Sequence, residues 1–235
     1  MLDRLFGLDS RRRRLLGRTR KGPLKDFLAV PFPSRDLPCQ DAEYVALDLE
    51  TTSLDPKRGL ILSVGYVLIA GGCIRVESAR HRIVRRIAPL PEQSVVIHGI
   101  TDDMAAQGED ELEVLEDLLE TLRGRVLLGH HARFDLRFLE MACDHHFAGR
   151  FICPVVDTLE LAQRRLERAG KPPRPGELRL DALRRHYHLP RYRAHHALTD
   201  ALGAAELFLA HWAHREGPKP LVLRDVLSRS RSRLS

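Results

Sequence analysis

Apolar runs in the first half of the chain predict β-strands. Tyr44–Leu49 and Leu60–Ala70 are rich in valine, isoleucine and leucine, and a Pro-Lys-Arg-Gly turn separates them, so we expect two adjacent strands. A third strand is expected around Ile74–Val84, after a Gly-Gly pair. The short apolar run Val126–Leu128 predicts one further, buried strand.

Helical spacing of apolar residues prevails in the second half. Leucines at positions 112, 115, 119 and 122 recur between acidic residues and predict an amphipathic helix. Further helices are expected at Phe134–Cys143, Val156–Arg168, Leu180–Tyr187 and Thr199–His214. Strands that come first and then alternate with helices predict an α/β domain, with a central mixed sheet flanked by helices.

The two ends of the chain differ from the middle in charge. Residues 1–40 hold ten Lys or Arg against four Asp or Glu, residues 217–235 hold five against one, and residues 41–216 hold 23 against 27. We expect a folded domain at 41–216, a loosely ordered or docking basic extension at 1–40 with a short helix near Leu2–Leu8, and a disordered basic tail at 217–235. Basic ends favour attraction to a polyanion, although solvated termini without a partner explain the same charge.

Cysteine spacing and the lack of long apolar segments restrict the class of protein. The four cysteines show no paired spacing, so we interpret them as reduced thiols of a cytoplasmic protein. Cys143 and Cys153 enclose His145 and His146, which raises a weak hypothesis of a zinc site. No apolar run could span a bilayer and none follows the arginines at 11–14, so we expect neither a membrane segment nor an export signal.

A pair of acidic residues ends the first predicted strand. Asp48 and Glu50 are two residues apart, so their side chains point to one face of the strand, and Ala46 is their small neighbour on that face. Two adjacent carboxylates repel each other unless a divalent cation neutralises them, and carboxylates are typical ligands of Mg²⁺ and Mn²⁺. The alternative is a pair of solvated acids on an edge strand, which the apolar run before them disfavours.

Two further acids and one histidine lie near predicted helix starts. Asp135 follows Phe134 in GHHARFD, and Asp200 follows Thr199 in HHALTDA. Either aspartate could simply stabilise the start of a helix. His195 precedes Asp200 by five residues in a polar loop, and an imidazole beside a metal site can take a proton from water.

Taken in order, these segments resemble the three motifs of the DEDDh family of 3′–5′ exonucleases, to which the proofreading epsilon subunit of bacterial DNA polymerase III belongs. DLETTSLDP is similar to the first motif, GHHARFD to the second and HHALTDA to the third. VIHGITDDM and VVDTLELA resemble the family's intervening segments, so the resemblance covers about residues 43–211. Ser53 stands where the family usually has glycine, and His131 stands where it usually has asparagine.

The resemblance implies an RNase H-like fold and phosphodiester hydrolysis with two divalent ions, Mg²⁺ or Mn²⁺. It implies that Asp48 bridges both ions, that Glu50 and Asp200 hold the ion that presents the attacking water, and that Asp135 supports the second. His195 is then the general base. The residues implied in substrate binding are Thr51 and Thr52 through their backbone amides, Leu54 through packing, and His98.

The function expected from this resemblance is release of nucleotides from the 3′ end of DNA, in proofreading or repair. The expected partners are single-stranded or frayed 3′ ends and a polymerase. Two alternatives stay open. One is an exoribonuclease that trims RNA with the same site, since nothing in the motifs recognises a 2′-hydroxyl. The other is a noncatalytic module that binds nucleic acid or docks to a polymerase, which the presence of all four acids and His195 disfavours.

Overall fold

A five-stranded mixed sheet forms the centre of the computed structural model, which describes residues 7–214 and 220–228. The strands are β1 (Tyr44–Thr51), β2 (Ile61–Ala70), β3 (Cys73–Ile83), β4 (Val126–Gly129) and β5 (Val155–Asp157). Their order is β3-β2-β1-β4-β5; β1 pairs antiparallel with β2 and parallel with β4, and β4 pairs parallel with β5. The predicted mixed sheet is confirmed, but Val155–Asp157 is a strand where a helix was expected from Val156.

Ten helices surround the sheet in the described part of the chain. They are α2 (Leu8–Leu16), α3 (Pro23–Ala29), α4 (Glu92–His98), α5 (Asp102–Ala106), α6 (Glu111–Leu122), α7 (Arg133–Phe147), α8 (Thr158–Arg168), α9 (Leu180–His186), α10 (Ala197–Ala213) and α11 (Leu223–Val226). The four helices expected from leucine spacing and from the later segments are present as α6, α7, α9 and α10, and α8 begins after β5. None of the described helices combines the length and the apolarity needed to cross a bilayer.

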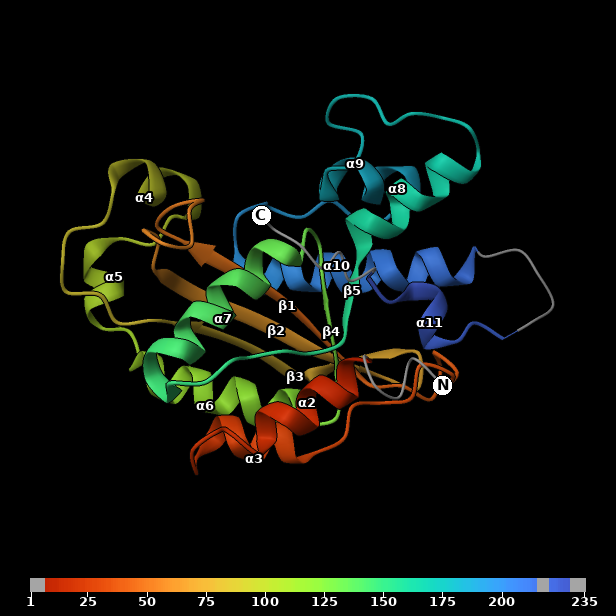
Figure 1. Ribbon diagram of the computed structural model, residues 1–235. Coiled ribbons are helices and arrows are strands. Elements are labelled where there is room, and N and C mark those ends of the chain that lie inside the picture. Colours follow the sequence, from red (N-terminus) through yellow and green to blue (C-terminus); the bar gives the residue numbers. More distant parts are fainter. Residues whose placement is uncertain (1–6, 215–219, 229–235) are drawn as a thin grey trace.

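The central strand β1 is buried on both faces, and its alternating side chains enter two separate cores. Val45, Leu47 and Leu49 pack in one core with residues of α3, α6 and α7. Ala46 packs in the other with residues of α10, such as Phe208. Figure 1 shows α10 on one face of the sheet and α2, α3, α6 and α7 on the other. Burial on both faces fixes the register of β1, and therefore where its acidic residues point.

The sequence predicts a loosely ordered or docking N-terminal extension. The prediction of loose order is wrong for the described residues of this segment, which pack against the domain. Leu24, Phe27 and Leu28 of α3 lie in the first core, and the Phe27 ring is 5.3 Å from the Phe151 ring, centroid to centroid. Arg12 is only 4% exposed, because its guanidinium donates to the Leu28 carbonyl at 2.5 Å and pairs with Asp9. The helix expected near Leu2–Leu8 falls mostly outside the described residues. Basic composition hid the apolar i, i+3, i+4 stripe of α3.

The predicted disordered tail is also corrected in part. Leu221, Leu223 and Val226 are buried in the second core. The backbone N–H of Leu223 donates to the Leu37 carbonyl at 3.0 Å, which ties the two ends of the chain together. Residues 229–235, which contain most of the Ser-Arg repeat, lie outside the described residues.

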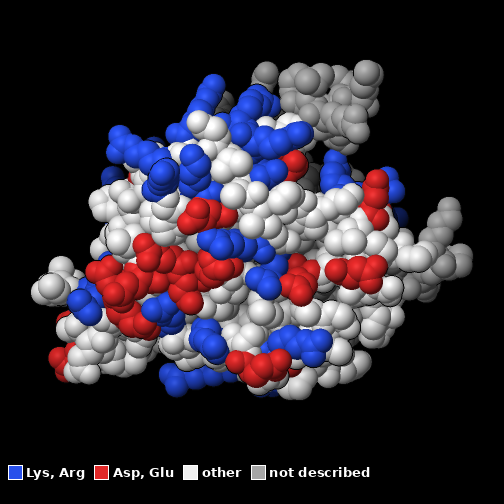
Figure 2. All heavy atoms as spheres, turned by 90° about the horizontal axis from the view of Figure 1, so that it is seen from below, with Lys and Arg blue, Asp and Glu red and all other residues white. Residues whose placement is uncertain are grey.

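Charged side chains on the face of α2, α3 and α6 are segregated. Figure 2 views this face and shows Lys and Arg gathered along one edge, with a patch of Asp and Glu beside them. Helix α6 carries the exposed acids Glu113, Glu116 and Glu120, and α2 carries the exposed bases Arg13 and Arg14. Side chains of opposite charge therefore lie next to each other on this face (Figure 2).

Candidate active site

Strand β1 presents the first two predicted site residues side by side. Asp48 pairs with Gly65 of β2 and Glu50 pairs with Ser63, so both carboxylates leave the same face of the sheet. The register shifts between Glu50 and Thr51, where the strand approaches its end. Glu50 is buried and Asp48 is partly exposed, so a pair of acids lies at the edge of the second core. They are not solvated acids on an edge strand, because β1 is central.

Gly65 allows the third acid to approach. A Cβ at Gly65 would lie 2.0 Å from the backbone nitrogen of Leu198 and 2.2 Å from the carbonyl carbon of Ala197. Any side chain there would push the start of α10 off the sheet, and Asp200 stands in the first turn of that helix. Gly65 was not among the residues predicted from the sequence, although an isolated glycine inside an apolar strand is a signal of close backbone approach.

The segment before α10 is held against Asp200. The backbone N–H of His195 donates to Asp200 Oδ2 at 2.8 Å, and His195 has a left-handed backbone conformation with φ of 65°. His196 caps the helix, because its Nδ1 accepts from the Thr199 backbone N–H at 3.4 Å. Asp200 therefore holds the loop before α10 through this hydrogen bond, and its carboxylate also lies near those of Asp48 and Glu50. The sequence left open that Asp200 only stabilises the start of this helix; Asp200 does lie in the first turn, but the cap itself is His196.

Asp135 reaches the same region from the other core. It lies in the first turn of α7, is 3% exposed and is hydrogen-bonded by the backbone of Leu49. Asp157, at the end of β5, lies close enough to raise the pKa of Asp135 further. Asp157 caps α8 through the Leu159 N–H at 3.0 Å and also accepts the His131 N–H at 2.9 Å. It thereby fixes His131, the residue in place of the family's asparagine, in a left-handed conformation with φ of 64°.

Crowding of the acids changes their protonation. Burial raises the pKa of Asp48 well above its usual range, and the neighbouring carboxylates, chiefly that of Asp135, raise it further. Burial is also the main cause of the raised pKa of Asp135 and of Asp200. Each shift shows that the ionised form is disfavoured where it stands. A bound cation would reverse this preference, because it stabilises the ionised carboxylates.

The arrangement fits divalent metal ions. Ligand atoms of Asp48, Glu50 and Asp200 lie within 4.8 Å of one another, and so do those of Glu50, His98 and His195. Glu50 Oε1 is buried and has no hydrogen-bond partner among the described residues. An unpartnered buried carboxylate oxygen is costly, and a cation would satisfy it. The two groups share Glu50, and neither includes Asp135.

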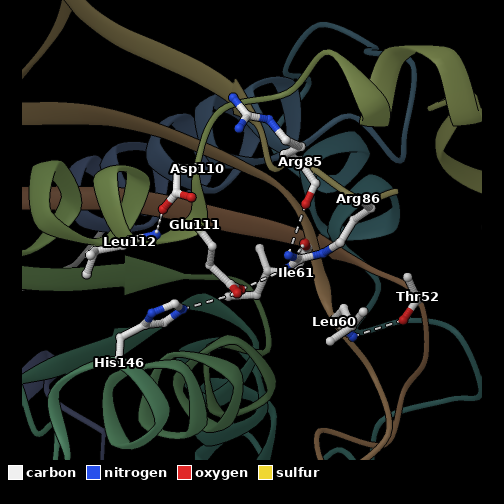
Figure 3. Close-up of polar contacts among 9 residues, drawn as sticks. All are labelled: Thr52, Leu60, Ile61, Arg85, Arg86, Asp110, Glu111, Leu112 and His146. Atoms are coloured by element: carbon white, nitrogen blue, oxygen red, sulfur yellow. Dashed lines mark hydrogen bonds and ion pairs between the residues drawn. The ribbon is translucent and has the colours of Figure 1, made fainter. Parts of the chain in front are cut away.

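Of the predicted substrate-binding residues, His98 is placed directly against the acids. It lies at the end of α4 and contacts Glu50 Oε2 through Nδ1. Leu54 is 85% exposed, and its role in binding stays a prediction. The Thr52 backbone N–H, however, already donates to the Leu60 carbonyl at 3.0 Å, and the Thr52 hydroxyl accepts from the Leu60 N–H (Figure 3). In this conformation the Thr52 amide cannot also meet a substrate.

The zinc hypothesis gains no support from the described residues. Clusters of metal-ligand type among them include neither Cys143 nor Cys153, which are buried thiols with pKa values raised by burial. His146 is directed instead toward Glu111, at 3.3 Å, and Glu111 also pairs with Arg86 at 2.8 Å (Figure 3). This network joins α6, α7 and the segment after β3.

A cleft of about 1220 Å³ opens beside the acids. Asp48, His195 and Asp200 line it together with residues of the α8–α9 loop, of α9 and of the loop that leads to α10. His130 also lines the cleft, and burial lowers the pKa of His130 to about 4, so it is neutral at pH 7. The site is thus open to an extended ligand on the side of α9.

Comparison with known proteins agrees with this geometry. A family model of the RNase T type, described as exonuclease, matches residues 45–208. The chain belongs to this exonuclease family. The match confirms the resemblance drawn from the three acidic motifs.

Similar sequences to this exonuclease chain include parts of long polymerases. It is 32% identical over 169 residues to DNA polymerase III PolC-type of Thermotoga maritima, covering 72% of this chain and 12% of the relative. It is 30% identical over 176 residues to the corresponding protein of Lacticaseibacillus paracasei, covering 75% and 12%. The chain thus spans about an eighth of the length of these relatives.

Solved structures share the fold of the exonuclease chain. E. coli ExoI, in a zinc-bound complex with single-stranded DNA, superposes with a TM-score of 0.61 at 16% identity, covering 74% of this chain and 41% of that one. Exonuclease X, in complex with 5′ overhanging duplex DNA, gives a TM-score of 0.53 at 24% identity, covering 73% and 91%. The expected RNase H-like fold is confirmed.

Proposed function

We propose that this chain is a metal-dependent 3′–5′ exonuclease that removes nucleotides from the 3′ end of DNA. The observation that carries the proposal is the convergence of Asp48, Glu50 and Asp200 within 4.8 Å, with one Glu50 oxygen unpartnered, beside His195 in an open cleft. The likeness to PolC-type DNA polymerase III and to DNA-bound exonucleases favours DNA over RNA.

The acids would hold two Mg²⁺ or Mn²⁺ ions, and when bound these supply a Lewis acid for the phosphate and lower the pKa of water. Asp48 would lie between the two positions, Glu50 and Asp200 would hold one, and Asp135 would support the other. Asp135 has to reach its position from the buried side, where Leu49 now hydrogen-bonds it. Its support is therefore the least direct of the four.

His195 would act as the general base. The water that attacks the phosphorus gives its proton to the imidazole, the bond from phosphorus to the 3′-oxygen breaks, and a nucleoside 5′-monophosphate leaves. The leaving 3′-oxygen takes up a proton from solvent, so the strand that remains ends in a new 3′-hydroxyl. His195 suits this role because its backbone is tied to Asp200 while its ring lies near Glu50 and His98.

The substrate end would meet residues at the end of β1. We propose that the Thr51 backbone, Leu54 and His98 position the terminal nucleotide, with the exposed Leu54 side chain packing against its base or sugar. Thr52 would join them only if its hydrogen bond to Leu60 opened. Action on frayed 3′ ends in proofreading or repair, and beside a polymerase, is proposed from the polymerase relatives. A cytoplasmic location stays a prediction.

The test uses single strands of DNA and RNA of one sequence, labelled at the 5′ end. We expect a ladder of DNA products shortened from the 3′ end in Mg²⁺ or Mn²⁺, no products in EDTA, and slower loss of RNA. Faster degradation of RNA would establish the exoribonuclease alternative instead. Intact strands under all conditions, with binding retained, would establish the noncatalytic module.

A further inference from the structure

The folded body carries a basic region that its total charge conceals. Residues 164–193 contain ten Lys or Arg against three Asp or Glu, a net charge of +7, although residues 41–216 as a whole come to −4. The region comprises the C-terminal part of α8, the α8–α9 loop, α9 and the first part of the loop to α10. Figure 1 shows α8, α9 and their loop standing clear of the sheet, on the opposite side of the molecule from α2 and α3.

Three arginines of this region line the cleft and have no acidic partner. Arg174, Arg179 and Arg191 are exposed, line the same cleft as Asp48 and Asp200, and form no ion pair with any described residue. Their neighbours differ. Arg184 pairs with Glu206 at 2.7 Å, and Arg185 pairs with Asp181 at 3.1 Å. Unpaired guanidinium groups along a cleft are suited to phosphate oxygens, which they can bind through two hydrogen bonds.

The same cleft offers a surface for bases. Tyr192 lines it, is 42% exposed and is held in place by its hydroxyl, which donates to Glu206 at 2.7 Å. Prolines at 173, 175 and 190 restrict the loops that carry the arginines. Positive charge that follows a backbone, together with an aromatic ring that stacks bases, is the usual combination for single-stranded nucleic acid.

We propose that Arg174, Arg179 and Arg191, the arginine wall, bind phosphates of a single strand whose 3′ end lies at the acids. The inference rests on the proposed function, since it assigns the path of the substrate on the 5′ side of its last nucleotide. The arginine wall contributes to binding of the strand, and the acids and His195 carry out the hydrolysis. The charge of the sequence suggested that the basic ends attract a polyanion. In this proposal the contact with the polyanion is made by the folded body instead.

The experiment compares two charge-matched variants. In one, Arg174, Arg179 and Arg191 are all changed to Gln; in the other, Arg18, Arg20 and Lys21 are changed to Gln. The control residues are exposed, lie between α2 and α3 and lose the same three charges. Binding of labelled single-stranded DNA of about 16 nucleotides, within the usual site size, is measured by anisotropy in EDTA over a salt series. No strand is cut under these conditions.

We expect the wall variant to bind more weakly and the slope of log K against log salt to shrink by about 2, because each single-strand phosphate contact contributes about 0.7. The control should keep the wild-type slope. The p-nitrophenyl ester of thymidine 5′-monophosphate has a single phosphate, which lies at the acids in the proposed function. Its hydrolysis therefore uses none of the phosphates that the arginine wall would bind, and it should be unchanged in both. Equal slopes for the wall variant and wild type, or an equal loss in the control, would overturn the proposal. Absence of hydrolysis in wild type would overturn the proposed function and leave the binding comparison valid.

Discussion

The two walls of the cleft are built in different ways. The acidic wall stands on regular structure: Asp48 and Glu50 leave a central strand whose neighbours fix its register. The other wall, called the second wall below, consists of residues 169–196. These residues form loops around the short helix α9 and include His195, whose backbone is left-handed. Strand pairing holds the first wall; side-chain contacts must hold the second. Hydrolysis needs His195 and the acids at fixed positions relative to each other. We therefore expect substitutions far from the site to disturb the loops of the second wall more than the strand of the first.

Arg184 is the main contact that holds the second wall. Its guanidinium donates to the Gly203 carbonyl of α10 and to the Pro190 carbonyl of the loop, both at 2.8 Å. It also pairs with Glu206 and lies 4.4 Å from the centre of the Tyr192 ring. One buried side chain therefore ties α9, α10 and the loop before His195 together.

Removing an acid from the first wall should have the largest effect. We expect Asp48→Asn to lower turnover by at least about 10³-fold, because ion-mediated charge stabilisation contributes several kcal/mol and each 1.36 kcal/mol is tenfold. The metal-free variant should melt at a higher temperature than wild type, since a repulsive buried charge is lost. Turnover in Mg²⁺ and thermal melting in EDTA check both. Near-normal turnover would remove Asp48 from the metal ligands.

Removing the imidazole from the second wall should rank next. His195→Ala is expected to lower turnover by about 10²–10⁴-fold, the range for loss of a general base. Added imidazole should restore part of the rate, whereas His196→Ala, which removes a cap of α10, should lower stability and gain nothing from imidazole. If imidazole rescues neither variant and His195→Ala turns over normally, His195 is structural.

Gly65 is the position in β2 where the start of α10, which carries Asp200, packs directly against the sheet. We expect Gly65→Ala to cost about 1–3 kcal/mol, as overpacked cores do, and to lower turnover, because α10 must shift and carry Asp200 with it. Gly17→Ala is the control, since its new Cβ would meet no atom closer than 3.7 Å. Chemical denaturation and turnover at saturating substrate check the pair. A fully active Gly65→Ala protein would show that the acids tolerate movement of α10.

The difference between the walls also explains what the sequence could predict. Strands β1 to β4, the acids and the helices α6, α7, α9 and α10 follow from local periodicity and spacing, so these could be predicted. Strand β5 could not, because Val155 and Val156 run directly into α8. The buried helix α3 could not, because its apolar stripe of Leu24, Phe27 and Leu28 is short and lies among basic residues. Nor could the cleft, because a charge count along the chain cannot show that Arg174 and Arg191 line one cleft with Asp48.

A smaller effect is expected from loosening the second wall. Arg184→Met should destabilise the protein by about 1–3 kcal/mol, the cost of buried hydrogen-bonding groups left unsatisfied, and should reduce turnover because the loop before His195 is freed. Arg185→Met, on the same helix, loses only exposed contacts with Asp181, an ion pair and a hydrogen bond to its carbonyl, and serves as the matched control. A purely structural role for Arg184 would lower the melting temperature and leave the turnover of the folded protein, measured well below that temperature, unchanged.

The smallest effect concerns pH and the acidic wall alone. Asp48, Asp135 and Asp200 have raised pKa values in the folded state, so between the usual carboxylate range and those values the folded protein binds more protons than the unfolded chain. Their contribution to the free energy of unfolding therefore falls as pH rises through this window. Other groups act oppositely, for example His211, whose pKa is lowered to about 4 by burial and nearby arginines, so the comparison must isolate the acids.

The isolating comparison is between wild type and Asp48→Asn in EDTA, melted from about pH 4 to 8, a range that spans the ordinary carboxylate pKa and neutrality. We expect the advantage of the variant in melting temperature to grow as pH rises, because over this range the unfolded wild-type chain ionises Asp48 whereas the folded state keeps it protonated. Because Mg²⁺ binds the ionised carboxylates, it should stabilise wild type more at the upper end of the range than at the lower. At a hundredfold excess over its Kd the stabilisation is about 2.7 kcal/mol. A variant advantage that is independent of pH would mean that Asp48 is ionised throughout the range. The acidic wall would then tolerate its charges without a cation, and the two walls would differ only in their backbone.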